Sequence, residues 1–165
     1  MSLSTELSPE SAALNVREAA LSAPYFRGRV LDVGSGGGYP IVSVAILRPD
    51  LDICLCERRT RRAAYLQYLL AELGLRRVAV EAAEARTLAT GWGTVSARAV
   101  PVPGRFLEWA TRIVAASGRL ILYVGSESAA AMRPSLETFH VKHDFHLVPG
   151  MRSRGFLVAD VGAGE

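Results

Sequence analysis

Four glycines fall within the five residues 34–38, inside the segment DVGSGGGYP that runs from Asp32 to Pro40. An apolar, strand-like run precedes this segment and an apolar, helix-like run follows it. Glycine adopts positive φ readily and has no Cβ, so a glycine-rich turn lets a ligand approach the backbone closely. At the carboxyl end of the first strand of an α/β sheet, such a turn lies beside the point where ligands bind. The segment therefore predicts a ligand-binding loop, the alternative being a glycine-rich turn that holds no ligand.

The spacing of the glycines narrows the choice of ligand. The dinucleotide pattern G-x-G-x-x-G needs glycine at position 39 or 41, which Tyr39 and Ile41 occupy, and no Gly-Lys-Ser/Thr follows to complete a P-loop. The pattern D-x-G-x-G-x-G does fit, with Asp32, Gly34, Gly36 and Gly38. It resembles the first motif of class I S-adenosylmethionine-dependent methyltransferases.

Glu57 is the second residue that could do chemistry. It ends the next strand-like run, 23 residues after Gly34. An acid in this place can accept hydrogen bonds from both hydroxyls of a ribose. An NAD site needs the same acid, so Glu57 indicates an adenosine-containing ligand without choosing the cofactor. The alternative is an acid that interacts favourably with the amino-terminal end of the following helix.

The elements that position these residues alternate between strand and helix. The helix pattern is clearest in 58–74, where an apolar stripe at spacings of three and four precedes Gly74. Strands are expected at 29–34, 51–57, 76–82, 94–100 and 118–125, with helices at 39–49, 58–74 and 102–116. This alternation predicts an α/β fold with a doubly wound, mainly parallel sheet.

Both ends of the chain depart from the alternation. Strands at 139–149 and 154–162 are joined by a short turn, so we expect a C-terminal antiparallel hairpin. The segment 126–137 reads as a short helix or a loop. Residues 1–25 read as an N-terminal helical segment with Ser8 as a possible cap. We expect residues 1–165 to form a single domain.

Composition excludes several classes of protein. No apolar run is long enough to span a membrane and the N-terminus lacks the pattern of a secretory signal, so we expect a cytoplasmic protein. Cys54 and Cys56 share one face of a strand and are expected to be buried and apolar in role. The net charge of +3 and pI of 9.2 permit a nucleic-acid partner.

Histidines recur as H-x-x-H-x-x-H at His140, His143 and His146. On a helix they would share a face, but on a strand His143 points away from the other two. Because the segment reads as a strand, we expect no metal site there.

A longer stretch of sequence resembles the 16S ribosomal RNA 7-methylguanosine methyltransferases, the RsmG (GidB) family. The family's D-V-G-S-G-A-G-F-P-G-I, L-R-P-D, E-S-x-x-K-K-x-x-F-L, E-L-G-L, T-S-R-A-V and G-G-R-L-L-x-x-K-G segments have counterparts in order between Val30 and Gly125. The resemblance implies a class I methyltransferase fold of Rossmann-like type, S-adenosylmethionine as cofactor and a guanine N7 of small-subunit ribosomal RNA as methyl acceptor. Ribosomal RNA or the small ribosomal subunit would be the partner.

The resemblance also implies roles for particular residues. Asp32, Gly34, Ser35, Gly36, Gly38 and Pro40 would form the cofactor loop. Glu57 would hold the ribose and Arg58 the edge of the cofactor, while Glu84 and Ala85 would meet the adenine. Arg98 would face the methionine end of the cofactor or the acceptor base. Arg59, Arg61 and Arg62 would face the RNA, although a solvated helix face explains this cluster equally well.

The chain departs from the family pattern at four places. Ile41 replaces a loop glycine, Val124 replaces a lysine, the family's Arg-Ala-Glu reads Glu84-Ala85-Arg86 with the charges exchanged, and only about 25 residues precede the first strand of the sheet. These departures keep two alternatives open: a methyltransferase-like module that binds cofactor or RNA without turnover, and a small-molecule methyltransferase. Guanine N7 carries an available lone pair, so its methylation needs positioning and electrostatics but no general base.

Overall fold

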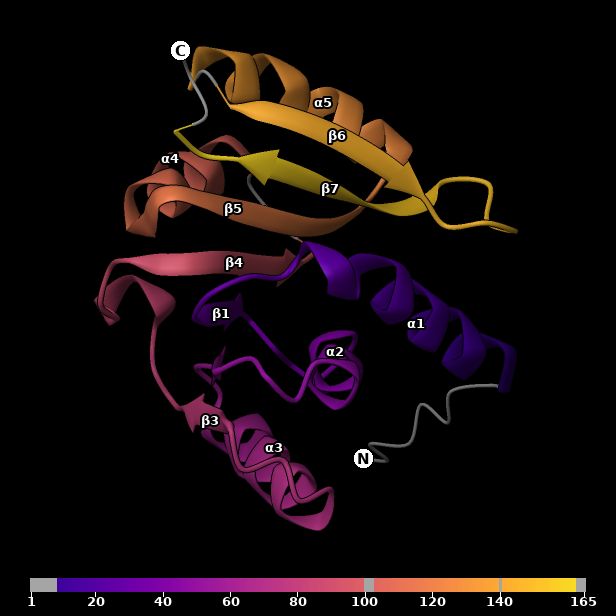
Figure 1. Cartoon of the computed structure of the whole chain (residues 1–165), viewed down its shortest axis with the longest axis vertical. Coiled ribbons are helices and arrows are strands. Elements are labelled where there is room, and N and C mark those ends of the chain that lie inside the picture. Colours follow the sequence, from indigo (N-terminus) through magenta and orange to yellow (C-terminus); the bar gives the residue numbers. More distant parts are fainter. Residues whose placement is uncertain (1–8, 100–102, 140, 163–165) are drawn as a thin grey trace.

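The computed structural model describes residues 9–99, 103–139 and 141–162, and its centre is one seven-stranded sheet (Figure 1). The strands lie in the order β3-β2-β1-β4-β5-β7-β6. Five are parallel: β1 (Val30–Val33), β2 (Ile53–Cys56), β3 (Val78–Glu81), β4 (Trp92–Arg98) and β5 (Val114–Gly125). The last two, β6 (Lys142–Leu147) and β7 (Arg154–Asp160), form the antiparallel hairpin expected from the sequence.

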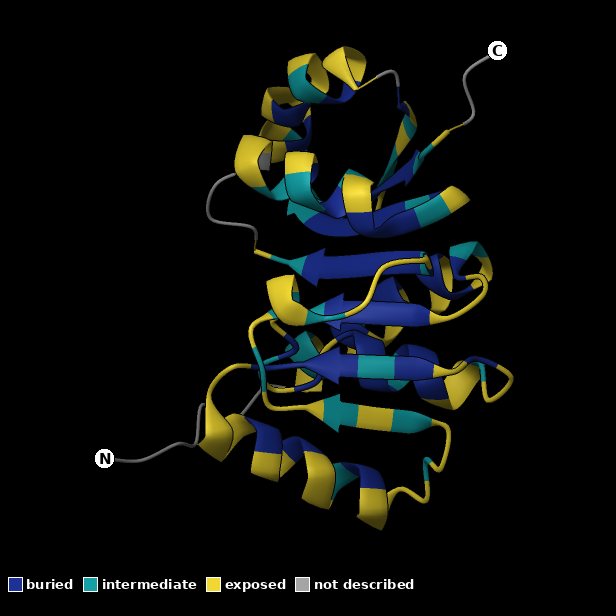
Figure 2. Cartoon of the chain, turned by 90° about the vertical axis from the view of Figure 1, so that its left-hand side faces the viewer, coloured by how far each residue is buried: buried dark blue, intermediate teal, exposed yellow. Residues whose placement is uncertain are grey.

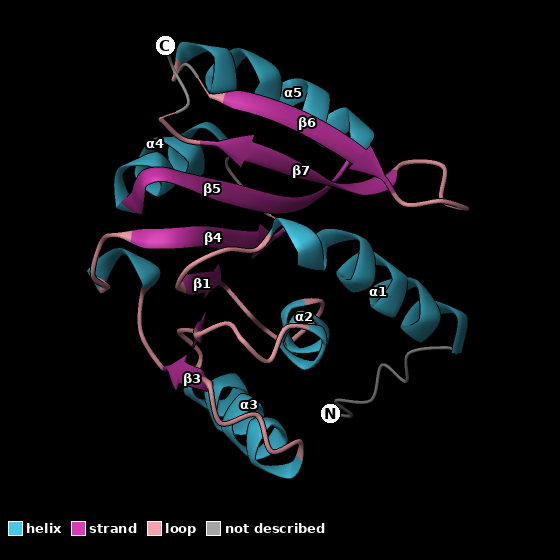
Figure 3. Cartoon of the chain, in the orientation of Figure 1, coloured by secondary structure: helices cyan, strands magenta, loops and turns pink. Residues whose placement is uncertain are grey.

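Helices cover both faces of the sheet (Figure 3). The bounds are α1 (Pro9–Ser22), α2 (Ile41–Leu47), α3 (Thr60–Glu72), α4 (Pro103–Ile113) and α5 (Ser126–Thr138), with single 3₁₀ turns η1 (Ala23–Tyr25) and η2 (Ala85–Thr87). One core cluster joins α1, α2 and α3 to the sheet, and a second joins α4 and α5 to its other face. The doubly wound, mainly parallel α/β fold predicted from the sequence is confirmed.

Burial explains why these segments read so clearly in the sequence. The central strands β1 and β4 are covered on both sides and are nearly continuous in buried residues, whereas the edge strand β3 alternates between half-buried and exposed positions (Figure 2). The apolar stripe of α3 supplies Ala63, Leu66 and Leu70 to the core. A helix whose apolar face meets a sheet in this way is stabilised mainly by that burial.

The predicted end of the helix at 102–116 is wrong. The described helix stops at Ile113, and residues 114–116 begin β5. The Gly91 N–H donates to the Ile113 carbonyl at 2.8 Å, and Val114 pairs with Trp92 across the sheet. Pairing with a neighbouring strand therefore overrides the helix propensity of the alanines in this stretch.

Other boundaries shift by smaller amounts. The helix expected at 58–74 begins at Thr60, because Arg58 and Arg59 belong to the turn after β2. The segment 126–137 forms a full helix, since Ala129, Met132 and Leu136 pack on the sheet. The expected cap Ser8, like residues 100 and 140, lies outside the described residues.

The two cysteines share one face of the sheet, as expected, and lie on the side covered by α4 and α5. Cys56 is buried as expected, whereas Cys54 is only half-buried, and both are free. Burial raises the pKa of Cys54 to about 11 and that of Cys56 to about 12, so both thiols stay protonated.

The two described histidines lie on different faces of β6. His146 stacks on Phe156 with ring centroids 5.0 Å apart, while His143 faces α5 across the strand. No helix in the described part of the chain has the length and apolar character to cross a membrane.

Candidate functional site

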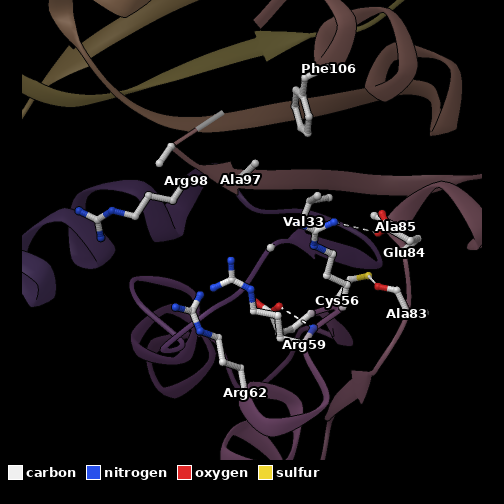
Figure 4. A pocket seen from close by; sticks show the side chains of 14 residues that line it. Val33, Cys56, Arg59, Arg62, Ala83, Glu84, Ala85, Ala97, Arg98 and Phe106 are labelled. Carbon is white, nitrogen blue, oxygen red and sulfur yellow. Dashed lines mark hydrogen bonds and ion pairs between the residues drawn. The ribbon is translucent and has the colours of Figure 1, made fainter. Parts of the chain in front are cut away.

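A cavity of about 390 Å³ opens at the carboxyl ends of β1, β2 and β4 (Figure 4). This is the place where the strand order reverses between β1 and β4, the position at which doubly wound sheets bind ligands. Its lining comes from the ends of four strands, from the start of α3 and from α4: Val33, Gly34, Cys56, Glu57, Arg58, Arg59, Arg62, Ala83, Glu84, Ala85, Ala97, Arg98, Ala99 and Phe106. The size suits a small ligand, and both apolar and charged groups face it.

The glycine loop forms one wall of this region. The N–H groups of Gly34 and Ser35 both donate to the Cys56 carbonyl, at 2.8 and 3.2 Å, which holds the loop against the end of β2. Gly38 has a φ of +89°, and a Cβ there would lie 2.8 Å from Val42 Cγ2. Only glycine satisfies both the conformation and the packing at that position. The loop is therefore a fixed wall.

Glu57 joins the loop to the start of α3. Its side chain is buried, and its two carboxylate oxygens accept the Gly36 N–H at 3.1 Å and the Arg59 N–H at 2.9 Å. A carboxylate has about four lone-pair sites, so each oxygen can accept a further hydrogen bond from a ligand in the cavity. The Arg59 contact supports the alternative of an acid that interacts with the start of the following helix. Glu57 can make this contact and bind a ligand at the same time.

Asp32 lies beneath the loop and outside the cavity lining. It is buried and accepts a hydrogen bond from Ser96 Oγ at 2.6 Å, which links β1 to β4. Burial raises its pKa to about 6, against the opposing effects of Ser96, Ser35 and the Arg98 charge. Of the residues expected to form the cofactor loop, Gly34 lines the cavity, whereas Asp32, Ser35, Gly36, Gly38 and Pro40 lie outside its lining.

The four arginines between residues 58 and 62 differ in where their side chains lie. Arg58 lines the cavity and pairs with Glu84 at 3.4 Å, an exposed contact of small energetic value. Arg59 and Arg62 also line the cavity, and Figure 4 shows both side chains opposite Phe106. Arg61 is exposed on α3 and does not line it. The structure thus brings two of the three expected RNA-facing arginines to the cavity.

Arg98 stands at the end of β4, between this cavity and a second one of about 330 Å³. Its guanidinium lies 3.4 Å from Glu18 Oε2, and Glu18 is only 1% exposed. Arg154 binds the same carboxylate at 2.7 Å. Burial lowers the pKa of Arg98 and the Glu18 charge opposes that shift, so the side chain remains a cation.

Sequence reasoning missed several members of this region. Glu18 carried a usable signal, because it shares a buried helix face with Ala19 and Ser22, where a carboxylate requires a partner. Phe106 gave none, since aromatic residues on amphipathic helices are usually core. The small residues at strand ends also gave none: Val33, Cys56, Ala83, Ala97 and Ala99.

Within the described residues, no group of three or more histidine, cysteine, aspartate or glutamate side chains is arranged to hold a metal ion.

Comparison with solved structures identifies the class of protein to which this fold belongs. The chain is similar in structure to a SAM-dependent methyltransferase from Aquifex aeolicus, with a TM-score of 0.72, 17% identity and coverage of 93% of both chains. It is also similar to precorrin-6y C5,15-methyltransferase from Geobacter metallireducens, with a TM-score of 0.69, 14% identity, and coverage of 96% of this chain and 92% of that one. The fold is that of the class I methyltransferases.

Sequence comparison then gives the family. The family described as rRNA small subunit methyltransferase G (GidB) matches residues 13–149, and the chain belongs to it. Ribosomal RNA small subunit methyltransferase G of Nitrosospira multiformis is 34% identical over 164 residues, covering 93% of this chain and 76% of that protein. The protein of the same name from Acidothermus cellulolyticus is 40% identical over 98 residues, covering 59% and 44%. The chain spans about half the length of several such relatives. The family resemblance drawn from the motifs is confirmed.

Proposed function

We propose that this protein transfers a methyl group from S-adenosylmethionine to a guanine N7 of small-subunit ribosomal RNA. The observation that carries the proposal is the buried Glu57 carboxylate, which lies against the glycine loop at the cavity where the strand order reverses. Membership of the rRNA small subunit methyltransferase G family supports the choice of reaction and acceptor. The reaction would take place in the cytoplasm, in a single domain formed by residues 1–165.

The residues of the cavity fit such a cofactor. Glu57 keeps lone pairs for the two ribose hydroxyls, as nucleotide-binding folds require. Glu84 and Ala85 line the side next to β3, where backbone groups would meet the adenine, and Arg58 borders the same side. Phe106 supplies an apolar surface from α4. When bound, S-adenosylmethionine supplies an electrophilic methyl group on a positively charged sulfur.

The remaining chemistry falls to positioning. Guanine N7 needs no proton removed before it is methylated, so the site needs no general base. Arg98 is a half-buried cation that pairs with Glu18 and lines both cavities, and it would orient a carboxylate, a phosphate or the acceptor base. Cys56 lines the cavity with its pKa raised to about 12, so it serves as an apolar wall and not as a nucleophile.

The arginines would meet the RNA. Arg59 and Arg62 lie at the cavity, and Arg61 lies one residue away on the outer surface of α3. Within the described residues none of these three guanidinium groups forms an ion pair, which leaves their charge for phosphate groups.

The test is transfer of labelled methyl groups to small ribosomal subunits, to naked ribosomal RNA and to a panel of small molecules, alongside titration of cofactor binding. We expect labelled 7-methylguanine in the RNA of the subunits or in naked RNA. Cofactor and RNA binding without any product would identify a module without turnover, and product only with small molecules would identify a different enzyme. Failure to bind S-adenosylmethionine or S-adenosylhomocysteine at millimolar concentration would overturn the cofactor assignment.

A further inference from the structure

The outer surface of α3 carries two exposed tyrosines in line with an arginine. Arg61, Tyr65 and Tyr68 are spaced four and three residues apart, so they form one ridge on the side of the helix away from the core. Tyr65 is 50% exposed and Tyr68 is 64% exposed. The opposite face of the helix, with Ala63, Leu66 and Leu70, already makes the packing against the sheet. The core therefore does not explain the two aromatic rings.

This ridge is continuous with the cavity. Arg62 follows Arg61 directly and lines the cavity, as does Arg59 in the turn before the helix. From Arg61 to Tyr68 the helix rises by about 10 Å, which suits a few nucleotides. Glu72, one further turn along the same side, places a negative charge at the far end of the ridge. Positive charge is thus concentrated at the end nearest the cavity.

The chemistry of the ridge favours one kind of partner. Aromatic rings provide faces on which any base can stack, and unpaired arginines neutralise phosphates or stack on bases themselves. The other large exposed apolar side chains on the helices of this face include Ile46 on α2 and Val16 and Leu21 on α1, none of which offers an aromatic ring. Tyr39, which is 41% exposed in the glycine loop, carries a further ring, but on the helices of this face the combination of exposed rings with unpaired arginines belongs to α3.

We propose that the ridge of Arg61, Tyr65 and Tyr68 binds a single-stranded segment of the RNA substrate by stacking its bases, and leads that segment toward the cavity. The inference rests on the proposed function, since it names the surface that holds the RNA flanking the acceptor guanine. The arginines supply affinity that depends on salt, and the tyrosines supply affinity that depends on the bases.

The test measures binding of a fluorescein-labelled single-stranded RNA 12-mer by fluorescence anisotropy. The variants Tyr65→Leu and Tyr68→Leu keep an apolar side chain but remove the ring, and each should weaken binding by about tenfold. Tyr65→Phe and Tyr68→Phe should bind like the wild type because they keep the stacking face. Ile46→Ala is the matched control, since Ile46 is 53% exposed on α2, and it should leave binding unchanged.

An abasic oligomer of the same length separates stacking from charge. We expect the wild type and the Tyr65→Leu/Tyr68→Leu double variant to bind this oligomer equally, with the same dependence on salt. Equal affinity of the two proteins for the base-containing 12-mer would overturn the inference. So would equal weakening by the phenylalanine and leucine variants, because the hydroxyls and not the rings would then make the contact.

Two further outcomes separate this inference from the proposed function. If the double variant binds naked RNA normally but loses affinity for the small ribosomal subunit, the ridge faces a protein and the stacking role is wrong, while the methyltransferase proposal stands. If the wild type binds the cofactor but no RNA of any kind, both the RNA acceptor and the ridge are wrong. Circular dichroism of each variant confirms that its fold is retained.

Discussion

The backbone N–H of Gly36 donates to Glu57 Oε2 at 3.1 Å, so the glycine loop after β1 and the turn after β2 are held together by one buried carboxylate. The other oxygen of Glu57 accepts the Arg59 N–H. Glu57 thereby positions the loop and the start of α3 before any ligand arrives. This preorganisation reduces the ordering cost of binding a ligand in the cavity.

Replacing Glu57 by glutamine should weaken cofactor binding. Glutamine keeps the shape of the side chain, but it loses the charge that strengthens hydrogen bonds from ribose hydroxyls. Its amide nitrogen also cannot accept the backbone N–H that one carboxylate oxygen accepts, and we expect a combined loss of about 1.5–3 kcal/mol. Titration calorimetry with S-adenosylhomocysteine measures the effect. Glu72→Gln is the matched control, because Glu72 is an exposed acid on α3 away from the cavity. Equal affinities in the two variants would mean that Glu57 is only structural.

Gly38→Ala should destabilise the protein, whereas Gly37→Ala should not. A Cβ at Gly38 would lie 2.8 Å from Val42 Cγ2 and 3.2 Å from Leu66 Cδ2, at a φ of +89°. Strain and overpacking together should cost about 2–4 kcal/mol. A Cβ at Gly37 would meet nothing within 4 Å, so its effect should stay within about 0.5 kcal/mol. Denaturant unfolding compares the two, and equal midpoints would contradict the packing argument.

Much of this architecture was predictable because local pattern and tertiary structure agree. The glycine loop, Glu57 and the C-terminal hairpin lie where the sequence patterns placed them. The start of β5 was not predictable, because the segment 114–116 has good helix formers and its strand conformation comes from pairing with Trp92. Propensity is a weak guide wherever a distant strand supplies the hydrogen bonds.

The site was predictable only in part for a similar reason. Motifs identify residues that follow one another in the chain, such as the loop glycines and the arginines around Arg59. The contact between Glu18 and Arg98 joins residues eighty positions apart, and only the docking of α1 against the sheet brings them together. The cavity wall formed by Phe106 depends in the same way on how α4 packs.

Asp32 should make stability depend on pH. Burial raises its pKa from 3.8 to about 6, so the folded protein holds this proton more tightly than the unfolded chain does. The resulting stabilisation is fully present below pH 3.8 and is lost as the pH rises through 6, a difference of about 3 kcal/mol. Asp32→Asn cannot titrate at this position. The free energy of unfolding of the wild type should therefore fall relative to this variant between pH 4 and 7, and parallel profiles would refute the assignment.

Glu18→Gln should cost more stability than the loss of an exposed acid. Glu18 is buried and faces both Arg98 and Arg154, so its neutralisation leaves two partly buried cations without their counter-charge. We expect a loss of about 3 kcal/mol. Asp50→Asn removes an exposed partner of Arg48 and should cost less than about 1 kcal/mol. Thermal and denaturant unfolding of both variants measure the difference. Equal losses of unfolding free energy would show that the buried ion pairs of Glu18 stabilise the fold no more than an exposed pair does.

Arg98→Ala should reduce methyl transfer far more than it reduces cofactor affinity. Arg98 lines both cavities, whereas Arg154 binds the same Glu18 carboxylate but lines only the second one. Arg154→Ala is therefore the matched control, since each substitution removes one arginine from Glu18. We expect Arg98→Ala to lower kcat by roughly 100-fold, in line with the loss of a charge that orients reacting groups, with cofactor Kd changed less than about tenfold. Arg154→Ala should lose stability while keeping most of its turnover.

Single-turnover transfer of labelled methyl to small subunits, with cofactor titration on the same samples, measures both kcat and cofactor Kd. Equal losses of turnover in the two variants would assign Arg98 to the stability of α1 docking and remove it from the reaction.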